Sequence, residues 1–109
     1  VVVTQGPADE AQVKAVASRL PPDNTWLLAE ESLPRVAAVM QRCAAFVGND
    51  SGITHLAAAV GTPVVAVFGP TDPALWAPRG RSVVTLASKP GEAWPGVREV
   101  TDALDAVRR

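Results

Sequence analysis

The chain has 109 residues, of which 48% are hydrophobic, and a formal net charge of −1 at pH 7. This length supports one domain with one core, and the composition excludes a disordered chain. The near-neutral charge argues against a nucleic-acid partner, because no long-range field would attract one. The single cysteine, Cys43, excludes an internal disulfide, and no apolar run reaches the roughly 18 residues that would span a membrane. The first residues, Val1-Val2-Val3, are strand-like and lack an initiator Met, so we expect a piece of a longer protein.

Short apolar runs alternate with helical patterns along the chain. The expected strands cover residues 1–4, 26–29, 45–48, 64–68 and 83–86. Asp9 and Gln12 have the spacing of a capping box before the first helix. That helix is expected to end at Pro21-Pro22, and its expected apolar face is Val13, Val16, Ala17 and Leu20. Ser32 is expected to cap a second helix, whose apolar face is Leu33, Val36, Ala37 and Met40.

The third helix is expected over residues 52–60 and should stop at Gly61. Its expected inward side chains are Ile53, Leu56, Ala57 and Val60. Residues 69–81 predict a long loop, and residues 87–99 predict an irregular connection. Thr101 is expected to cap the last helix.

The alternation of strands and helices predicts an α/β fold, a Rossmann-like three-layer α/β/α sandwich formed by residues 1–109 as a single domain. We expect a parallel sheet of strand order 2-1-3-4-5, in which the topological switch point falls between the first and third strands. Ligands bind outside the carboxyl ends of the strands at such a point. These ends are Gln5-Gly6-Pro7 and Asn49-Asp50-Ser51-Gly52, so both should line one crevice.

Asp50-Ser51-Gly52 allows two interpretations. Asp and Ser commonly cap helices, and Gly permits a tight turn. The same turn can offer backbone N–H groups of Ser51 and Gly52 to a diphosphate, with the Ser51 hydroxyl as another donor. Asp50 would repel phosphate, so capping the helix or accepting hydrogen bonds from sugar hydroxyls suits it better. His55 lies outside the expected apolar stripe and in the first helical turn, which favours contact with a ligand over a structural role.

Further residues fall at the same expected edge. The Gly69-Pro70-Thr71 turn follows the fourth strand, and Trp76 on its loop either packs the loop down or stacks on a ligand. Glu31 and Glu10 either accept hydrogen bonds from ribose hydroxyls or stabilise the nearby helix N-termini through their negative charge. No Walker A, Gly-x-Gly-x-x-Gly or Gly-x-Ser-x-Gly motif is present. A metal site is not expected, because there is no second His and no cysteine cluster.

The run from Asn49 to Ala59, with Gly61-Thr62-Pro63 and residues 68–73, resembles the signature of glycosyltransferase family 9. This is the heptosyltransferase family of lipopolysaccharide core assembly. The resemblance is dense over about a quarter of the chain, and residues 6–10 and 32–33 support it weakly. Ser51 stands where many relatives have Thr, which keeps the hydroxyl.

The resemblance implies the C-terminal, donor-binding half of a GT-B fold. It implies that Asp50, Ser51, Gly52 and His55 hold the diphosphate and sugar of an ADP-heptose-like donor. Gly69, Pro70 and Thr71 would line the same pocket, with Gly6, Glu10 and Glu31 expected at that crevice. The family inverts the anomeric centre without metal or cofactor, and its base, an Asp, belongs to the other domain.

On this reading the fragment alone binds the donor without turning it over. Its partners are a nucleotide sugar and, through the missing domain, a lipid A–core acceptor. The resemblance places the enzyme in the cytoplasm, with peripheral association at the inner membrane. Two other functions stay open: a nucleotide-sugar 2-epimerase, which shares the architecture but needs more acid/base residues, and a non-catalytic nucleotide-binding or interaction module.

Overall fold

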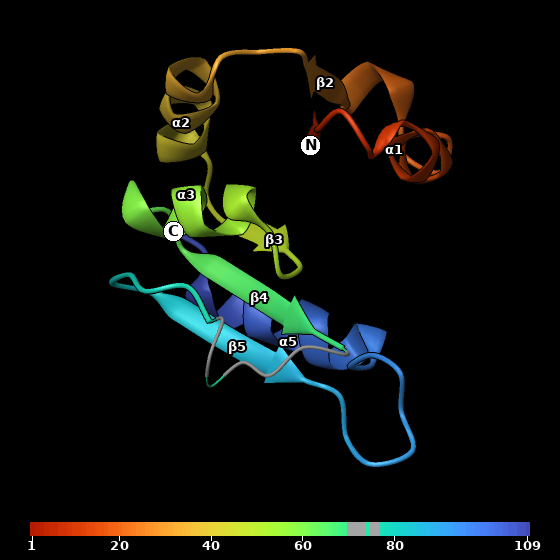
Figure 1. Ribbon diagram of the computed structural model, residues 1–109, viewed down its shortest axis with the longest axis vertical. Helices are drawn as coiled ribbons and strands as arrows, with labels where there is room; N and C mark the ends of the chain where they lie inside the picture. Colours follow the sequence, from red (N-terminus) through yellow and green to blue (C-terminus); the bar gives the residue numbers. More distant parts are fainter. Residues whose placement is uncertain (70–73, 75–76) are drawn as a thin grey trace. The chain divides into compact units, whose positions relative to one another are not determined.

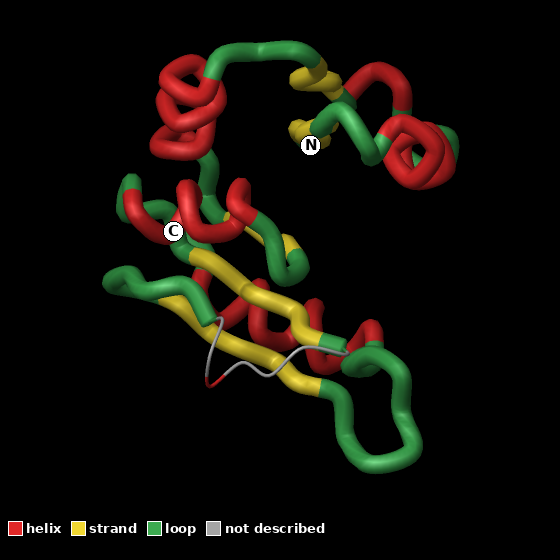
Figure 2. The backbone as a smooth tube through the Cα atoms, in the orientation of Figure 1, coloured by secondary structure: helices red, strands yellow, loops and turns green. Residues whose placement is uncertain are grey.

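The computed structural model describes residues 1–69, 74 and 77–109. The chain divides into two compact units, Val1–Val36 and Ala37–Arg109, and each is described by itself. Helices and parallel strands alternate within both of them (Figure 2). This confirms the predicted α/β class. Among the described helices, none is long and apolar enough to cross a membrane.

The first unit is built around a pair of parallel strands, β1 (Val2–Gln5) and β2 (Trp26–Ala29). Helix α1 (Glu10–Ala17) and a single 3-10 turn, η1 (Pro22–Asn24), connect them (Figure 1). The second strand has its predicted bounds. Helix α2 (Leu33–Arg42) begins in this unit and continues into the second.

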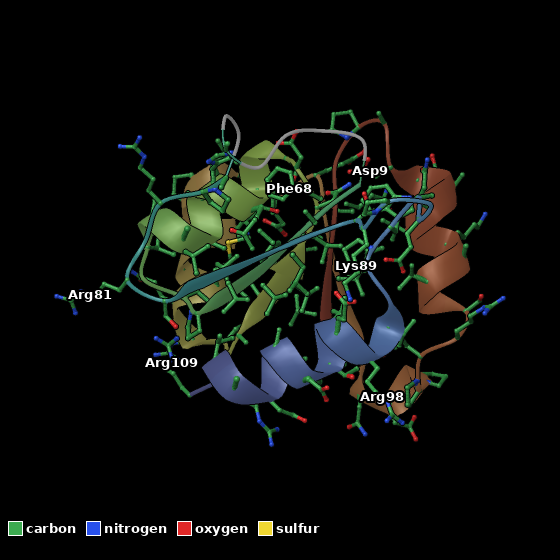
Figure 3. All side chains as sticks on the ribbon, turned by 90° about the horizontal axis from the view of Figure 1, so that it is seen from below. Asp9, Phe68, Arg81, Lys89, Arg98 and Arg109 are labelled. Atoms are coloured by element: carbon green, nitrogen blue, oxygen red, sulfur yellow. The ribbon has the colours of Figure 1, made fainter. Side chains whose placement is uncertain are left out.

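The second unit contains a parallel sheet of order β3-β4-β5. Its strands are β3 (Phe46–Gly48), β4 (Val64–Phe68) and β5 (Val83–Ala87). The described part of this unit also contains helices α3 (Gly52–Ala59) and α5 (Val97–Val107). Strand β4 lies in the middle and has the predicted bounds. Its near-continuous burial explains its uninterrupted apolar sequence. Figure 3 shows α3 and α5 on opposite sides of this sheet.

Side-chain bonds to the end of α2 tie this unit together. The hydroxyl of Thr62, which is 2% exposed, donates to the carbonyl of Met40 at 2.8 Å. The guanidinium of Arg109, beside the end of α5 in Figure 3, donates to the carbonyls of Gln41 and Cys43, each at 2.6 Å. The last residue of the chain is thereby held against the segment between α2 and β3.

Helix ends were predicted less well than strands. Helix α5 begins at Val97 with Gly96 as its N-cap, so the prediction that Thr101 caps it was wrong. Thr101 lies inside the helix and bonds back to the Arg98 carbonyl at 3.0 Å. The capping box at α1 was also wrong, since the Asp9 carboxylate instead accepts from the N–H of Gly6 at 3.2 Å. Helix α1 stops at Ala17, before the two prolines.

The apolar faces also differ in part from prediction. Val16 and Leu33 are exposed, whereas Val13, Val36 and Met40 are buried as predicted. Of the four side chains expected inward from the third helix, Ala57 is buried as predicted, whereas Ile53, Leu56 and Val60 are only partly buried. Thr54 and Ala58 are the other buried positions of α3. Gly61 ends α3 as predicted, with a φ of 87° that favours glycine.

Candidate functional site

The turn between β3 and α3 is held by two hydroxyl groups. Ser51 is the N-cap of α3, and its Oγ accepts from the N–H of Thr54 at 3.5 Å. The Thr54 hydroxyl donates to the Asn49 carbonyl at 2.7 Å. Since that uses its only proton, the 3.2 Å bond between the two hydroxyls must have Ser51 as its donor. The proton predicted to be free for a phosphate is therefore engaged in the turn, and Asp50 does not cap the helix.

The first backbone N–H groups of α3 remain open. No described residue accepts a hydrogen bond from the N–H of Gly52 or Ile53, whereas the N–H of His55 bonds to the Ser51 carbonyl at 3.3 Å. A Cβ built on Gly52 would meet nothing within 4 Å. Two N–H groups at a helix N-terminus thus have no acceptor among the described residues, and such groups are able to bind an anion.

Thr54 is the structural residue of this turn that the sequence reasoning missed. The residue is 1% exposed, although threonine is polar. Its hydroxyl both donates and accepts a hydrogen bond within the turn, which offsets the cost of burying a polar group. A Cβ at Gly48 would run into the Thr54 hydroxyl and the ring of Phe46. The serine–threonine spacing of an N-cap and its third helical residue was the available signal.

Asp50 and His55 lie on this same turn and first helical turn. The Asp50 side chain is partly buried and that of His55 is exposed. Neither side chain bonds or ion-pairs with another described residue. The structure thus brings Asp50, Ser51, Gly52 and His55 together, and both titratable side chains are available to a ligand.

Gly69 lies at the carboxyl end of the neighbouring strand β4. Its carbonyl accepts from the Ser88 hydroxyl at 3.2 Å, and Trp94 packs against its backbone. The predicted lining residues Pro70 and Thr71, and Trp76, lie outside the described residues. Gly69 is therefore the one member of the predicted turn that the structure describes.

Gly6, Glu10 and Glu31 belong to the first unit. Gly6 bonds to the Asp9 carboxylate, and Glu10 begins α1. Glu31 forms an exposed ion pair with Arg35 at 3.3 Å, which is worth little in solution. That these three residues line the same site as Asp50 stays a prediction.

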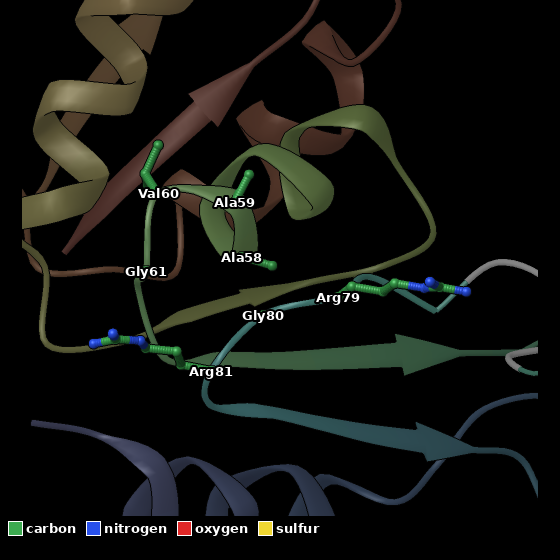
Figure 4. A pocket seen from close by; sticks show the side chains of 7 residues that line it. All are labelled: Ala58, Ala59, Val60, Gly61, Arg79, Gly80 and Arg81. Atoms are coloured by element: carbon green, nitrogen blue, oxygen red, sulfur yellow. The ribbon is translucent and has the colours of Figure 1, made fainter.

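The opposite end of α3 carries an open pocket (Figure 4). It is lined by Ala58, Ala59, Val60, Gly61, Arg79, Gly80 and Arg81. The two arginine side chains point away from each other, so they do not converge on one anion. Within the described part of the chain, no group of three or more His, Cys, Asp or Glu side chains could hold a metal ion.

Comparison with known proteins agrees with the motif. The model of the family described as "Glycosyltransferase family 9 (heptosyltransferase)" matches residues 1–104. The chain is 36% identical over 87 residues to lipopolysaccharide heptosyltransferase 3 of Escherichia coli, covering 77% of this chain and 26% of that protein. It is 41% identical over 66 residues to lipopolysaccharide heptosyltransferase 1 of Pseudomonas aeruginosa, covering 61% and 19%. The chain thus spans about a quarter or less of these relatives.

A solved structure has the same fold. It is the crystal structure of the glycosyl transferase family 9 from Veillonella parvula, with a TM-score of 0.71 and 24% sequence identity. The match covers 98% of this chain and 32% of that one. At this identity the likeness shows the fold alone.

Proposed function

The chain belongs to glycosyltransferase family 9, and from this premise we propose that it is the donor-binding, C-terminal half of a GT-B enzyme. In our proposal the complete enzyme transfers a heptose from ADP-heptose to a lipid A–core acceptor and inverts the anomeric centre. The observation that carries this is the β3–α3 turn, whose open N–H groups at Gly52 and Ile53 suit a diphosphate.

The turn's proposed share of catalysis is electrostatic. As the bond between the anomeric carbon and the diphosphate oxygen breaks, negative charge grows on the departing diphosphate. Fixed N–H donors and the positive end of the α3 dipole would stabilise that charge without reorganising. His55 would donate to the same diphosphate, and Asp50 would accept hydrogen bonds from sugar hydroxyls. The general base and the acceptor contacts belong, in this proposal, to the other domain, and no metal takes part.

We further propose that all five strands form one parallel sheet of order 2-1-3-4-5. The parallel pairing inside each unit and the likeness to a family 9 structure over nearly the whole chain support this order. It would bring Gly6, Glu10 and Glu31 to the crevice of Asp50. Nuclear Overhauser contacts between backbone protons of β1 and β3 would bear out the order, and their absence in a folded sample would contradict it.

Calorimetric titration with ADP, UDP and GDP, without added metal, tests the donor-binding role. We expect saturable binding of ADP that weakens at least tenfold in Gly52→Val, because branched carbons would crowd the open N–H groups. The fold should persist, since the space beside Gly52 is empty. Ala59→Val is the matched control, because it places the same side chain on an exposed position at the other end of α3.

The control also separates two locations. Ala59 lines the pocket that contains Arg79 and Arg81. If ADP bound in that pocket, Ala59→Val would lower the affinity for ADP and Gly52→Val would leave it unchanged. That pattern would overturn the assignment of the β3–α3 turn. Lack of ADP binding by both this chain and the complete protein that carries it would overturn the donor-binding role.

A further inference from the structure

Trp94 is held at the carboxyl end of β4 by its contact with Gly69. A Cβ built on Gly69 would lie 2.8 and 2.9 Å from the ring atoms Cδ2 and Cε3 of Trp94, and 2.7 Å from the Ala93 carbonyl oxygen. Any larger residue would displace the indole. The ring therefore packs directly on the glycine backbone at a turn that the family signature singles out.

The segment that carries Trp94 is itself anchored. The backbone N–H of Lys89 donates to the Glu92 carboxylate at 3.3 Å, and the N–H of Glu92 donates to the Lys89 carbonyl at 2.9 Å. The Lys89 ammonium pairs with Glu99 of α5 at 2.8 Å. Ser88 bonds through its N–H to Phe68 and through its hydroxyl to Gly69. These contacts fix the indole relative to the ends of β4 and β5.

Despite this anchoring, Trp94 is 49% exposed. The register pairs Gly48 with Ala66, so Gly69 lies three residues beyond Gly48 on the adjacent strand. Strand spacing and rise put the two glycine backbones about 11 Å apart. An open aromatic surface therefore shares the carboxyl edge of the sheet with the β3–α3 turn, within the reach of one nucleotide sugar.

We propose that Trp94 contacts the transferred sugar of the donor and packs its exposed indole surface against the apolar C–H face of the sugar ring. This rests on the proposed function, which puts the diphosphate at the N–H groups of Gly52 and Ile53. The transferred sugar is bonded directly to that diphosphate, and in our proposal it extends along the carboxyl edge of the β3–β4 pair towards Gly69 and Trp94. Aromatic side chains with few polar groups are typical walls of such pockets.

The test compares ADP-heptose with ADP on the wild type, Trp94→Ala and Trp94→Phe. Trp94→Ala should weaken ADP-heptose binding about tenfold, the effect of uncovering roughly 60 Å² of apolar surface, and leave ADP binding unchanged. Trp94→Phe should retain most of the affinity. Trp26→Ala, which removes another exposed indole, should affect neither ligand.

Equal weakening of both ligands would mean that Trp94 only supports the turn, and would overturn the proposal, as would no effect on either. If the wild type binds neither ligand, the proposed function fails and this inference falls with it. A second readout does not depend on the folding of Trp94→Ala. Trp26→Phe with Trp76→Phe leaves Trp94 as the sole tryptophan, whose emission should change on adding ADP-heptose and not ADP. An unchanged emission at saturation would overturn the proposal.

Discussion

Replacing Thr54 with valine should weaken the β3–α3 turn and the nucleotide site together. Valine fills the same volume but loses the donated bond to the Asn49 carbonyl and the bond shared with Ser51. Each bond contributes about 0.5–1.5 kcal/mol net, so we expect unfolding to become easier by about 1–3 kcal/mol. With the turn no longer held, Gly52 must be ordered on binding, and we expect ADP to bind about tenfold more weakly.

Thr62→Val is the matched control for this experiment. Thr62 is as buried as Thr54, but its hydroxyl makes one bond, to the Met40 carbonyl, at the other end of α3. That carbonyl keeps the N–H of Cys43 at 3.0 Å, so the loss should be about 0.5–1.5 kcal/mol. ADP affinity should stay within about twofold of the wild type.

Urea denaturation measures the stabilities, and calorimetry at a temperature where all three proteins are folded measures ADP affinity. Unchanged ADP binding in Thr54→Val would refute the reasoning that this hydroxyl positions the site. Equal weakening in both variants would refute it too, because affinity would then follow global stability alone.

Three more outcomes are expected. Asp50→Ala and His55→Ala should each lower heptose transfer by the complete enzyme on the order of 100-fold with little change in melting temperature; near-normal rates in both would remove them from the site. Gly61→Ala should cost about 1 kcal/mol in urea denaturation, because its φ of 87° disfavours a Cβ; no loss would contradict this. The hydrogen bond and charge of Glu99 raise the pKa of Lys89 above 10.5. The stability gained from this pair is therefore complete below pH 10.5 and lost as the pH rises through the folded pKa of Lys89. In urea denaturation at increasing pH, the difference in unfolding free energy between the wild type and Lys89→Met should therefore shrink above pH 10.5; a difference that stays constant with pH would contradict this.

Strands were predictable because each is a short run rich in apolar and β-branched residues, even where, as at Trp26 and Leu27, the side chains are exposed. Residues 26–29 and 64–68 form strands with the predicted bounds, and the other three shift by a residue at one or both ends. Helix ends were harder, since several residues compete as caps. Thr101 has a good cap side chain, but Val97 begins the helix four residues earlier, after the Pro95-Gly96 break. Val100, Ala103, Leu104 and Val107 then share one face, with Ala103 buried.

The candidate site was predictable as a location and less so in its bonding. The signature run identified the turn from Asp50 to His55, and the family comparison confirms the resemblance. Thr54 was not among the side chains expected to be buried, because it is polar. Its burial depends on a hydrogen bond to the Asn49 carbonyl, which only the folded turn brings into place. The contact between Gly69 and Trp94 joins residues 25 positions apart, which no local pattern reveals.

The central claim is that the open N–H groups of α3 bind the donor's diphosphate. The most direct measurement is a series of ¹H–¹⁵N correlation spectra of this chain during titration with ADP. The account predicts the largest amide shifts at Gly52, Ile53 and His55, with little change at Arg79 and Arg81. Saturable shifts centred on those arginines, with Gly52 and Ile53 unmoved, would contradict it.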